Sequence, residues 1–375
     1  MNISAWIKNN HFLALALALA FFNALAIFIA FGFQKYGDSS DYIRLIHWFL
    51  GEGSSFEVER MLRPLGPFLA LPLEFLGDGA GLIAQNIFFY FLSCLLIFKI
   101  VDLVFQNKKQ ALFAVLFFMT ATPIIESGLA YLTDMGAWCF YLLSIFLTLS
   151  YFKNKNEKIL VINGLLSGIG VLMKENGGLG VIFFALMVLF SRDFNIKEKI
   201  YKILKFGIIF IAPIVALQVF AYNSFHYTSL DWYLRNPSGS PGEGLFMIFL
   251  RYLGQLFRIL GLVWLPLLFG LWLAVKEKNP SRNKIYFALI PASFSFLLWS
   301  VSASARSVFI FAPLGILLAS HGFVSWFALL GKRGKVLLIS VFFAAVLVIN
   351  YAFCLVNQEI PFTDLIYNFI QRCIK

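Results

Sequence analysis

Two aspartates stand three residues apart at the point where the chain leaves its first apolar run. Asp38 and Asp41 lie in the stretch KYGDSSDYIRLIHWF, residues 35–49, directly after the apolar run 11–33. A carboxylate at the edge of a membrane can take a proton from an acceptor hydroxyl or amine and so act as a general base. The alternative is structural, because Asp also caps the N-terminus of a helix, here one that begins near Tyr42. Asp41 lies next to that helix, so a capping role explains it better than it explains Asp38.

Other charged residues stand beside apolar runs that are far apart in the chain. Arg60 and Arg63 lie in the first loop, Glu126 ends a later run, and Asp134 in YLTDMGAW begins the next one. The turn VLMKENGG supplies Lys174 and Glu175, and Arg306 in SASARSVFIFAPLG opens another run. A charge at the centre of a membrane helix costs roughly 2.5–3.5 kcal/mol, so such residues should be paired, exposed to a water-filled cavity or functional. Together they offer a carboxylate base beside several cations, which suits transfer to a deprotonated acceptor while a phosphate leaves.

Each of these residues also has a structural interpretation. Asp134 follows Thr133 at a helix start and can serve as a cap. Lys174 ends an outward-running helix, where a cation suits the helix dipole and can extend into water. Arg306 begins an inward-running helix, where a positive charge opposes the dipole, so we expect it to have a buried anionic partner. Three other acidic residues are interpreted as solvated loop charges: Glu57, Glu59 and Asp78.

The composition is that of an integral membrane protein. Mean hydropathy is +0.83 and only 13% of the residues are charged, which excludes an ordinary soluble domain. Apolar runs long enough for a helix to cross a bilayer recur along the chain, and no long polar segment separates them. We therefore expect residues 1–375 to form a single all-α polytopic membrane domain, with the first run retained rather than removed as a signal peptide. The predicted spans number about eleven: 11–33, 80–105, 110–126, 134–152, 159–173, 177–191, 206–222, 257–275, 285–301, 307–328 and 336–356.

The distribution of charge predicts the orientation of these spans. The net charge of +11 would suit nucleic-acid binding if the basic residues gathered in one patch. Instead, one alternating set of connections holds nineteen of the 30 Lys and Arg residues with five acidic ones, and the other holds eleven basic and fourteen acidic residues. The positive-inside rule then places the N-terminus in the cytoplasm and the KYGDSSDY segment outside. We expect a multi-pass protein of the cytoplasmic membrane without a nucleic-acid partner, whose candidate residues share one level at the outer edge.

Two long connections lie on the predicted outer side. In the first, 34–79, apolar residues recur on one helix face from Tyr42 to Leu50, which predicts an amphipathic helix lying in the membrane interface. The next apolar piece, 64–76, contains three prolines and is too short to span, so it should be interfacial or re-entrant. The second connection, 223–243, is rich in aromatic residues and Gly and is interpreted either as a lid or acceptor contact or as a plain linker. A short amphipathic segment, 362–370, follows the last span.

An ordered set of short segments resembles a known family. GDSSDYIRL, RPLGPFLALPL, YLTDMGAW, LMKENG and SARSVFIFAPLG are similar to motifs of the GT-C superfamily, multi-pass glycosyltransferases that use polyprenyl- or dolichyl-phosphate sugars. Each motif is weak alone, but the set touches most of the chain. The family places an aspartate in the first outer loop with an aromatic residue four positions later, and Asp38 with Tyr42 fits that spacing. The resemblance thus implies Asp38 as the base, with Asp41 as the second candidate. It also implies, as substrate- or phosphate-binding residues, Arg63, Asp134, Lys174, Glu175 and Arg306.

The resemblance implies an inverting glycosyltransferase with an Asp general base. It would move one sugar, a hexose or a pentose, from a polyprenyl-phosphate donor to a glycan, lipid or protein acceptor on the outer side. An outer site has no nucleotide pool, so the donor should be lipid-borne, with its tail in an apolar groove among membrane lipids. No cofactor is certain, and a divalent metal ion stays open. Two alternatives are a polysaccharide polymerase or ligase that uses lipid-pyrophosphate glycans and a polytopic transporter or flippase. The latter should carry midplane charges and an internal repeat, which the sequence does not show.

Overall fold

The chain is helical throughout the part that the structure describes. The computed structural model describes residues 10–53, 55–235, 245–298 and 304–359, and these contain no β-strand. The longer helices are α2 (His11–Phe31), α3 (Gly37–Phe49), α5 (Ala80–Phe105), α6 (Lys108–Met119), α7 (Asp134–Asn154), α8 (Glu157–Met173), α9 (Gly180–Leu189), α10 (Ile196–Phe225), α12 (Leu245–Leu260), α13 (Trp264–Glu277), α14 (Pro280–Ser293), α16 (Ala312–Ala328) and α17 (Lys332–Glu359). The shorter helices and turns are η1 (Val58–Leu62), α4 (Leu65–Ala70), η2 (Leu71–Leu76), η3 (Ile124–Gly128), η4 (Glu175–Gly178), α11 (Ser229–Arg235), η5 (Gly261–Val263), η6 (Ser295–Leu298), α15 (Ala305–Val308) and η7 (Phe309–Phe311).

Seven stretches of helix in the described residues are long and apolar enough to cross a membrane. They confirm the predicted all-α membrane fold, but the count of about eleven spans is not confirmed. The predicted spans that have no counterpart among the seven coincide with α6, α8, α9 and α14, which are shorter helices. The candidate spans are His11–Phe31, Ala80–Phe105, Asp134–Asn154, Ile196–Phe225, Phe249–Glu277, Ala305–Ala328 and Lys332–Leu355.

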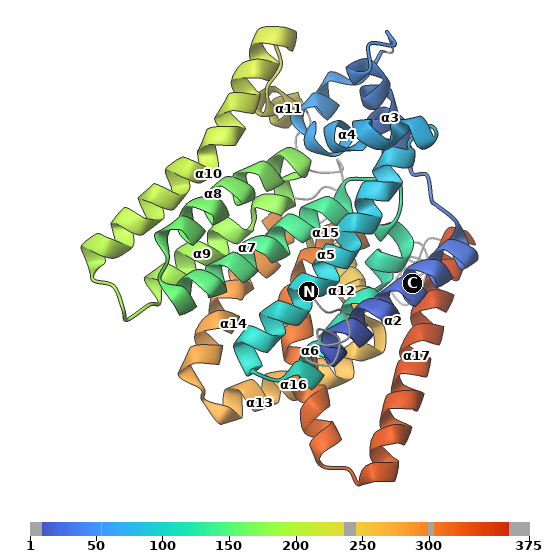
Figure 1. Ribbon diagram of the computed structural model, residues 1–375, viewed down its shortest axis with the longest axis vertical. Helices are drawn as coiled ribbons and strands as arrows, with labels where there is room; N and C mark the ends of the chain where they lie inside the picture. Colours follow the sequence, from blue (N-terminus) through green and yellow to red (C-terminus); the bar gives the residue numbers. More distant parts are fainter. Residues whose placement is uncertain (1–9, 54, 236–244, 299–303, 360–375) are drawn as a thin grey trace.

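The helices form a bundle in which α5 runs through the middle beside α2, α6 and α7 (Figure 1). The closest helix pair is α13 with α16. A Cβ atom on Gly270 would lie 1.9 Å from the carbonyl oxygen of Leu318, and one on Gly322 would lie 2.0 Å from that of Pro266. Small residues allow such close backbone approach in membrane helices, where van der Waals packing drives association. Helix α16 is buried from Ala312 to Phe323, and the η7 turn connects it to the short helix α15.

One end of the bundle gathers the first loop and the ends of several spans. We call it the α3 end, because α3, α4 and α11 lie there (Figure 1). The first turns of α5 and α7 and the last turn of α8 also reach it. At the opposite end, the α6 end, α5 and α7 finish and α6 begins. The candidate residues predicted to share one level lie on segments that meet at the α3 end.

Helix α3 begins earlier than the sequence predicts. It starts at Gly37 rather than near Tyr42, because the Ser39 hydroxyl accepts a hydrogen bond from the Tyr36 backbone N–H in a capping box. Asp38 therefore lies in the first turn, and the capping role considered for Asp38 and Asp41 is wrong. The predicted apolar face is confirmed in part, since Tyr42, Leu45 and Ile46 are buried while Leu50 is exposed.

The proline-containing piece after α3 is broken, as the sequence predicts. It forms α4 and η2, and α4 packs closely on α5, where a Cβ on Gly81 would lie 2.1 Å from the carbonyl oxygen of Ala70. Phe75 and Leu76 at its end stay exposed, as expected of a segment in the membrane interface. In the second predicted connection, 223–243, α10 continues to Phe225 and α11 follows, while residues 236–244 lie outside the described part. The predicted amphipathic segment 362–370 also lies outside it.

Candidate active site

Asp41 is buried and held by two arginines. Its carboxylate accepts a hydrogen bond from Arg44 on the same helix, and its other oxygen lies 3.0 Å from Nη2 of Arg60. Only 8% of its side chain is exposed. Burial disfavours the charged guanidinium of Arg60, but Tyr42 and the neighbouring Asp38 and Asp41 outweigh it and raise the pKa of Arg60 above its ordinary value. Asp41 is thus a fixed counter-ion at the base of the first loop.

Asp38 differs from Asp41 in that it faces the open part of the site. Nη2 of Arg60 lies 3.2 Å from one of its oxygens, and Nη1 of Arg306 lies 3.9 Å from the other. Its side chain is 38% exposed, so it remains reachable from outside the protein. Asp38 is the accessible carboxylate of the pair, and the two cations orient it without enclosing it.

Asp134 joins the first loop to the distant turns of the chain. Its side chain is 2% exposed; it lies 2.6 Å from Nζ of Lys174 and 3.6 Å from Nη1 of Arg306. It makes no capping hydrogen bond at the start of α7, so the capping interpretation of Asp134 is wrong. Lys174 points inward to this carboxylate rather than out to water. The anionic partner expected for Arg306 is present, in Asp134 and Asp38 together.

Arg63 and Glu175 form a further ion pair beside this set. Nη2 of Arg63 lies 2.7 Å from Oε1 of Glu175, and Nε donates a second hydrogen bond to the same oxygen at 2.8 Å. Burial opposes the charge on Arg63, but Glu175 and Tyr42 outweigh it and raise the pKa of Arg63 above its ordinary value. This pair ties the first loop to the η4 turn, which directly follows Lys174.

These residues form a charged network in which cations and carboxylates are equal in number. The network comprises five cations, Arg44, Arg60, Arg63, Lys174 and Arg306, and five carboxylates, Asp38, Asp41, Asp134, Glu175 and Glu57, the last of which lies 3.7 Å from Nε of Arg60. With all of them ionised, their charges balance. Nη1 of Arg306 is buried and makes no hydrogen bond within the described residues, since its carboxylate neighbours are 3.6 and 3.9 Å away. An unsatisfied guanidinium N–H favours the binding of an anion.

The structure shows the partners of two further predicted charges, Arg60 and Glu126, and adds Arg258, which the sequence does not single out. Arg60 bridges both aspartates. Arg258 of α12 forms a buried ion pair with Glu126, whose backbone carbonyl accepts a hydrogen bond from the Tyr36 hydroxyl at 2.7 Å. Burial, and then Glu126, raises the pKa of Tyr36 to about 12. The guanidinium of Arg306 lies 5.4 Å from the centre of the Tyr36 ring, which extends the network to this second pair.

A polar pocket of about 270 Å³ lies against the network. Arg60, Arg63 and Glu175 belong both to the network and to the wall of this pocket. Glu59, interpreted from the sequence as a solvated loop charge, is half-buried and also lines it, which corrects that interpretation. The aromatic loop 223–243 contributes through Trp232, and Ser229 and Leu62 complete the lining. The pocket therefore combines charged groups, a hydroxyl and one indole ring.

An apolar groove of about 450 Å³ runs between α13, α14 and α16. Its wall includes Phe311 in the η7 turn, which follows the α15 turn that carries Arg306. Phe294 and Trp264 each lie against Phe311, with ring centres 5.4 and 5.7 Å apart. The groove is lined almost wholly by aliphatic and aromatic side chains, so it suits a hydrocarbon chain.

The carboxylates of the network are occupied by cations. A group of three side chains, His47, Glu74 and Asp78, has ligand atoms within 4.8 Å of one another and could hold a metal ion. None of the three belongs to the network. A divalent ion therefore has two candidate locations, this group of three side chains and the carboxylates of the network.

Comparison with known proteins shows which proteins share this fold. The family described as dolichyl-phosphate-mannose-protein mannosyltransferase, PMT_2, matches residues 73–217, which is less than half of the chain. No curated protein matches the chain. The structure is similar to that of ArnT from Cupriavidus metallidurans bound to undecaprenyl phosphate, with a TM-score of 0.63 at 14% identity over 91% of this chain and 64% of that one.

Two structures of an oligosaccharyltransferase from Archaeoglobus fulgidus are also similar. The apo form gives a TM-score of 0.59 at 13% identity, covering 94% of this chain and 55% of that one. The structure of AglB in complex with an inhibitory peptide and a dolichol-phosphate gives a TM-score of 0.59 at 12% identity. The match covers 93% of this chain and 56% of that one. The chain thus spans about 55–64% of the length of these structures. These matches confirm the resemblance to the GT-C superfamily: the chain is a multi-pass membrane protein with the fold of GT-C glycosyltransferases.

Proposed function

We propose that the chain is an inverting membrane glycosyltransferase, with Asp38 as its general base. The observation that carries this proposal is the contrast within the charged network. Among the three aspartates Asp38 is the accessible one, whereas Asp41 and Asp134 are buried among cations; Glu175 is 32% exposed, but Arg63 binds it at 2.7 Å. The donor is a sugar on a polyprenyl phosphate, and transfer takes place on the outer side of the cytoplasmic membrane, where the positive-inside rule puts the α3 end.

The donor phosphate is assigned to Arg306 and Lys174. Nη1 of Arg306 has no hydrogen bond within the described residues, so a phosphodiester oxygen can accept one from it. The polyprenyl tail would then lie in the apolar groove that begins near Phe311. The family match and the ArnT structure, which is bound to undecaprenyl phosphate, support a lipid-phosphate ligand.

The reaction follows from this placement. Asp38 takes the proton of an acceptor hydroxyl or amine, whose heteroatom forms a bond to the anomeric carbon of the sugar. The bond between that carbon and the phosphate oxygen breaks at the same time. The phosphate leaves as the lipid monoester with one additional negative charge, which Arg306 and Lys174 stabilise. Attack opposite to the leaving phosphate inverts the anomeric configuration.

The acceptor enters through the polar pocket that Trp232 and Glu59 line. Arg60 lines this pocket and also contacts Asp38 at 3.2 Å. An indole ring can pack against the apolar face of a sugar while the charged groups bind its hydroxyls. Among glycan, lipid and protein acceptors, this lining favours a glycan.

The test is mass spectrometry of membrane lipids and surface glycans from cells that lack the protein. We expect the lipid-linked sugar donor to accumulate together with a glycan that is short by one residue. Reintroduced wild-type protein should reverse both changes. Unchanged lipids and glycans would contradict the enzyme function itself.

The role of Asp38 is tested in the purified protein. Asp38→Asn should lower the rate of transfer by roughly 100-fold or more, because general-base catalysis contributes about 10²–10⁴-fold. Asp193→Asn is the matched control, since Asp193 is an exposed carboxylate at the α6 end of the bundle, outside the network. The two variants should have similar melting temperatures. Full activity of Asp38→Asn would show that the base is another residue.

A further inference from the structure

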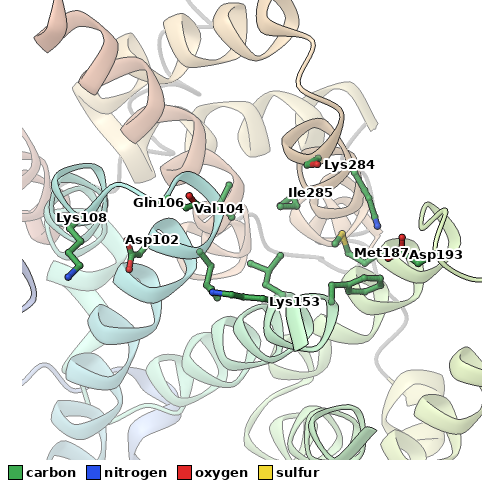
Figure 2. A pocket seen from close by; sticks show the side chains of 13 residues that line it. Asp102, Val104, Gln106, Lys108, Lys153, Met187, Asp193, Lys284 and Ile285 are labelled. Atoms are coloured by element: carbon green, nitrogen blue, oxygen red, sulfur yellow. The ribbon is translucent and has the colours of Figure 1, made fainter. Parts of the chain in front are cut away.

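The α6 end holds a cavity of about 740 Å³ that the proposed reaction does not use (Figure 2). It lies where α5 and α7 end and α6 and α14 begin. Figure 2 shows Lys108 and Asp102 at one side of it, Lys153 across its middle, and Lys284 with Asp193 at the other side. Apolar side chains complete the lining, among them Leu149, Phe152, Met187 and Ile285.

Lys284 is a half-buried cation without a close counter-ion. Its Nζ lies 4.6 Å from the centre of the Phe152 ring, and no carboxylate lies within 4.0 Å of it in the described part of the chain. The nearby Asp193 already binds Nζ of Lys155 at 2.5 Å. Burial lowers the pKa of Lys284, and Lys155 lowers it further, while Asp193 opposes both. An anion in the cavity would relieve this unfavourable environment.

Lys153 adds a second available charge. It is exposed at the end of α7, and it too has no carboxylate within 4.0 Å among the residues that the structure describes. Three lysines line the cavity against two aspartates, one of which is neutralised by Lys155. The cavity is therefore positively charged even with both aspartates ionised.

Orientation in the membrane alone does not explain this arrangement. The positive-inside rule requires basic residues in the connections of this end, but it does not require them to converge. Here, lysines from α6, α7 and α14 meet at one cavity that also has apolar walls. That combination matches a ligand with a phosphate at one end and hydrocarbon at the other.

We propose that this cavity binds the headgroup phosphate of an anionic phospholipid. Lys153 and Lys284 contact the phosphate, Lys108 adds charge at the rim, and the start of the acyl chains packs along Phe152 and Ile285. Basic pockets between membrane helices bind anionic headgroups in this manner. The inference is independent of the proposed transferase reaction, since it uses no residue of the charged network.

The experiment is native mass spectrometry of the full chain released from vesicles of phosphatidylglycerol and phosphatidylcholine in equal parts. Wild type should retain phosphatidylglycerol. A variant with Lys108, Lys153 and Lys284 changed to Gln should lose it by roughly 100-fold, because each lysine near an anionic lipid contributes about five-fold. The matched control changes Lys158, Lys197 and Lys278 to Gln, which lowers the net charge equally at exposed positions outside the cavity.

Three outcomes would overturn the proposal. Equal loss in both triple variants would show that retention follows overall charge rather than this cavity. Full retention in the cavity variant would place the lipid elsewhere. Displacement of phosphatidylglycerol by millimolar inorganic phosphate, with phosphate itself retained, would show a site for free phosphate. Melting temperatures of both variants within a few degrees of wild type would show that a lost lipid reflects the cavity.

Discussion

The two ends of the bundle hold charge in different ways. At the α3 end, cations and carboxylates alternate, and the central carboxylates, Asp41 and Asp134, are buried. At the α6 end, Lys153 and Lys284 line an open cavity with no carboxylate within 4.0 Å among the described residues. Buried pairs fix positions but are costly to break, whereas cations without a close carboxylate can attract an anionic ligand. The arrangement at the α3 end suits a reaction that depends on side chains in fixed orientations. The arrangement at the α6 end suits the binding of an anion, which requires less precise orientation.

The largest difference between the two ends should appear in stability. Asp134→Asn leaves Lys174 and Arg306 without their shared buried counter-ion, so we expect it to destabilise the protein by roughly 3–5 kcal/mol. Lys153→Gln removes an exposed, unpaired charge and should change stability by less than about 0.5 kcal/mol. Unfolding of both variants in the same detergent, followed by circular dichroism, measures the difference. Equal stability of the two variants would contradict the contrast between the ends.

The next effect concerns turnover at the α3 end. Arg306→Gln removes the N–H groups available to the leaving phosphate, so kcat should fall about 10²–10³-fold, as when one donor to a developing anion is lost. Arg306→Lys retains the charge but not the planar fork, and it should recover only part of the rate. Steady-state kinetics with a polyprenyl-phosphate sugar would separate kcat from the KM of the acceptor. A change confined to that KM would place Arg306 on the acceptor side.

The sequence predicts the shared location of the charged residues but not their pairing. The alternation of basic and acidic connections is enough to place Asp38, Asp134, Lys174 and Arg306 at one end, because topology fixes the level of each helix terminus. Which carboxylate meets which cation depends on side-chain directions in loops, which hydropathy does not encode. Arg60 is therefore predicted to lie at this level, but its contacts with both aspartates are not.

Two differences show where local patterns fail. The apolar period from Tyr42 predicts the face of α3, yet the capping box at Ser39 moves its start back to Gly37. Glu59 has the sequence context of a solvated charge, but it lines a pocket with Trp232, which lies far along the chain. Such long-range packing leaves no periodic signal. The predicted count of spans also exceeds the seven long apolar stretches, because α6, α8, α9 and α14 are shorter than those stretches.

A smaller effect is expected at the polar pocket. Trp232→Ala should raise the KM for the acceptor about tenfold and leave kcat nearly unchanged, because it removes binding surface away from the reacting atoms. Trp232→Phe retains an aromatic face and should recover much of the affinity. Kinetics at saturating donor and varied acceptor measure this effect. Loss of kcat at unchanged KM would instead indicate that α11 positions the catalytic groups.

The smallest effect comes from a histidine outside the network. Hydrogen bonds to Asp78 and then to Glu52 raise the pKa of His47 above its ordinary value. Because the pKa of His47 is higher in the folded state, its protonation stabilises the folded protein. This stabilisation is complete below the ordinary histidine pKa of about 6.5. It is lost as the pH rises through the pKa of His47 in the folded protein. The pairs are partly exposed, so the contribution should be a few tenths of a kcal/mol.

The melting temperature of wild type relative to His47→Gln should therefore fall between pH 6 and pH 8.5. His226→Asn is the control, because His226 is an exposed histidine at the end of α10 and Asn tolerates its left-handed backbone. The difference between wild type and that control should not change with pH in the same way. A pH-independent difference for His47→Gln would show that His47 acts by packing. The cavity at the α6 end has no histidine in its lining, so a response near neutral pH distinguishes the α3 end from it.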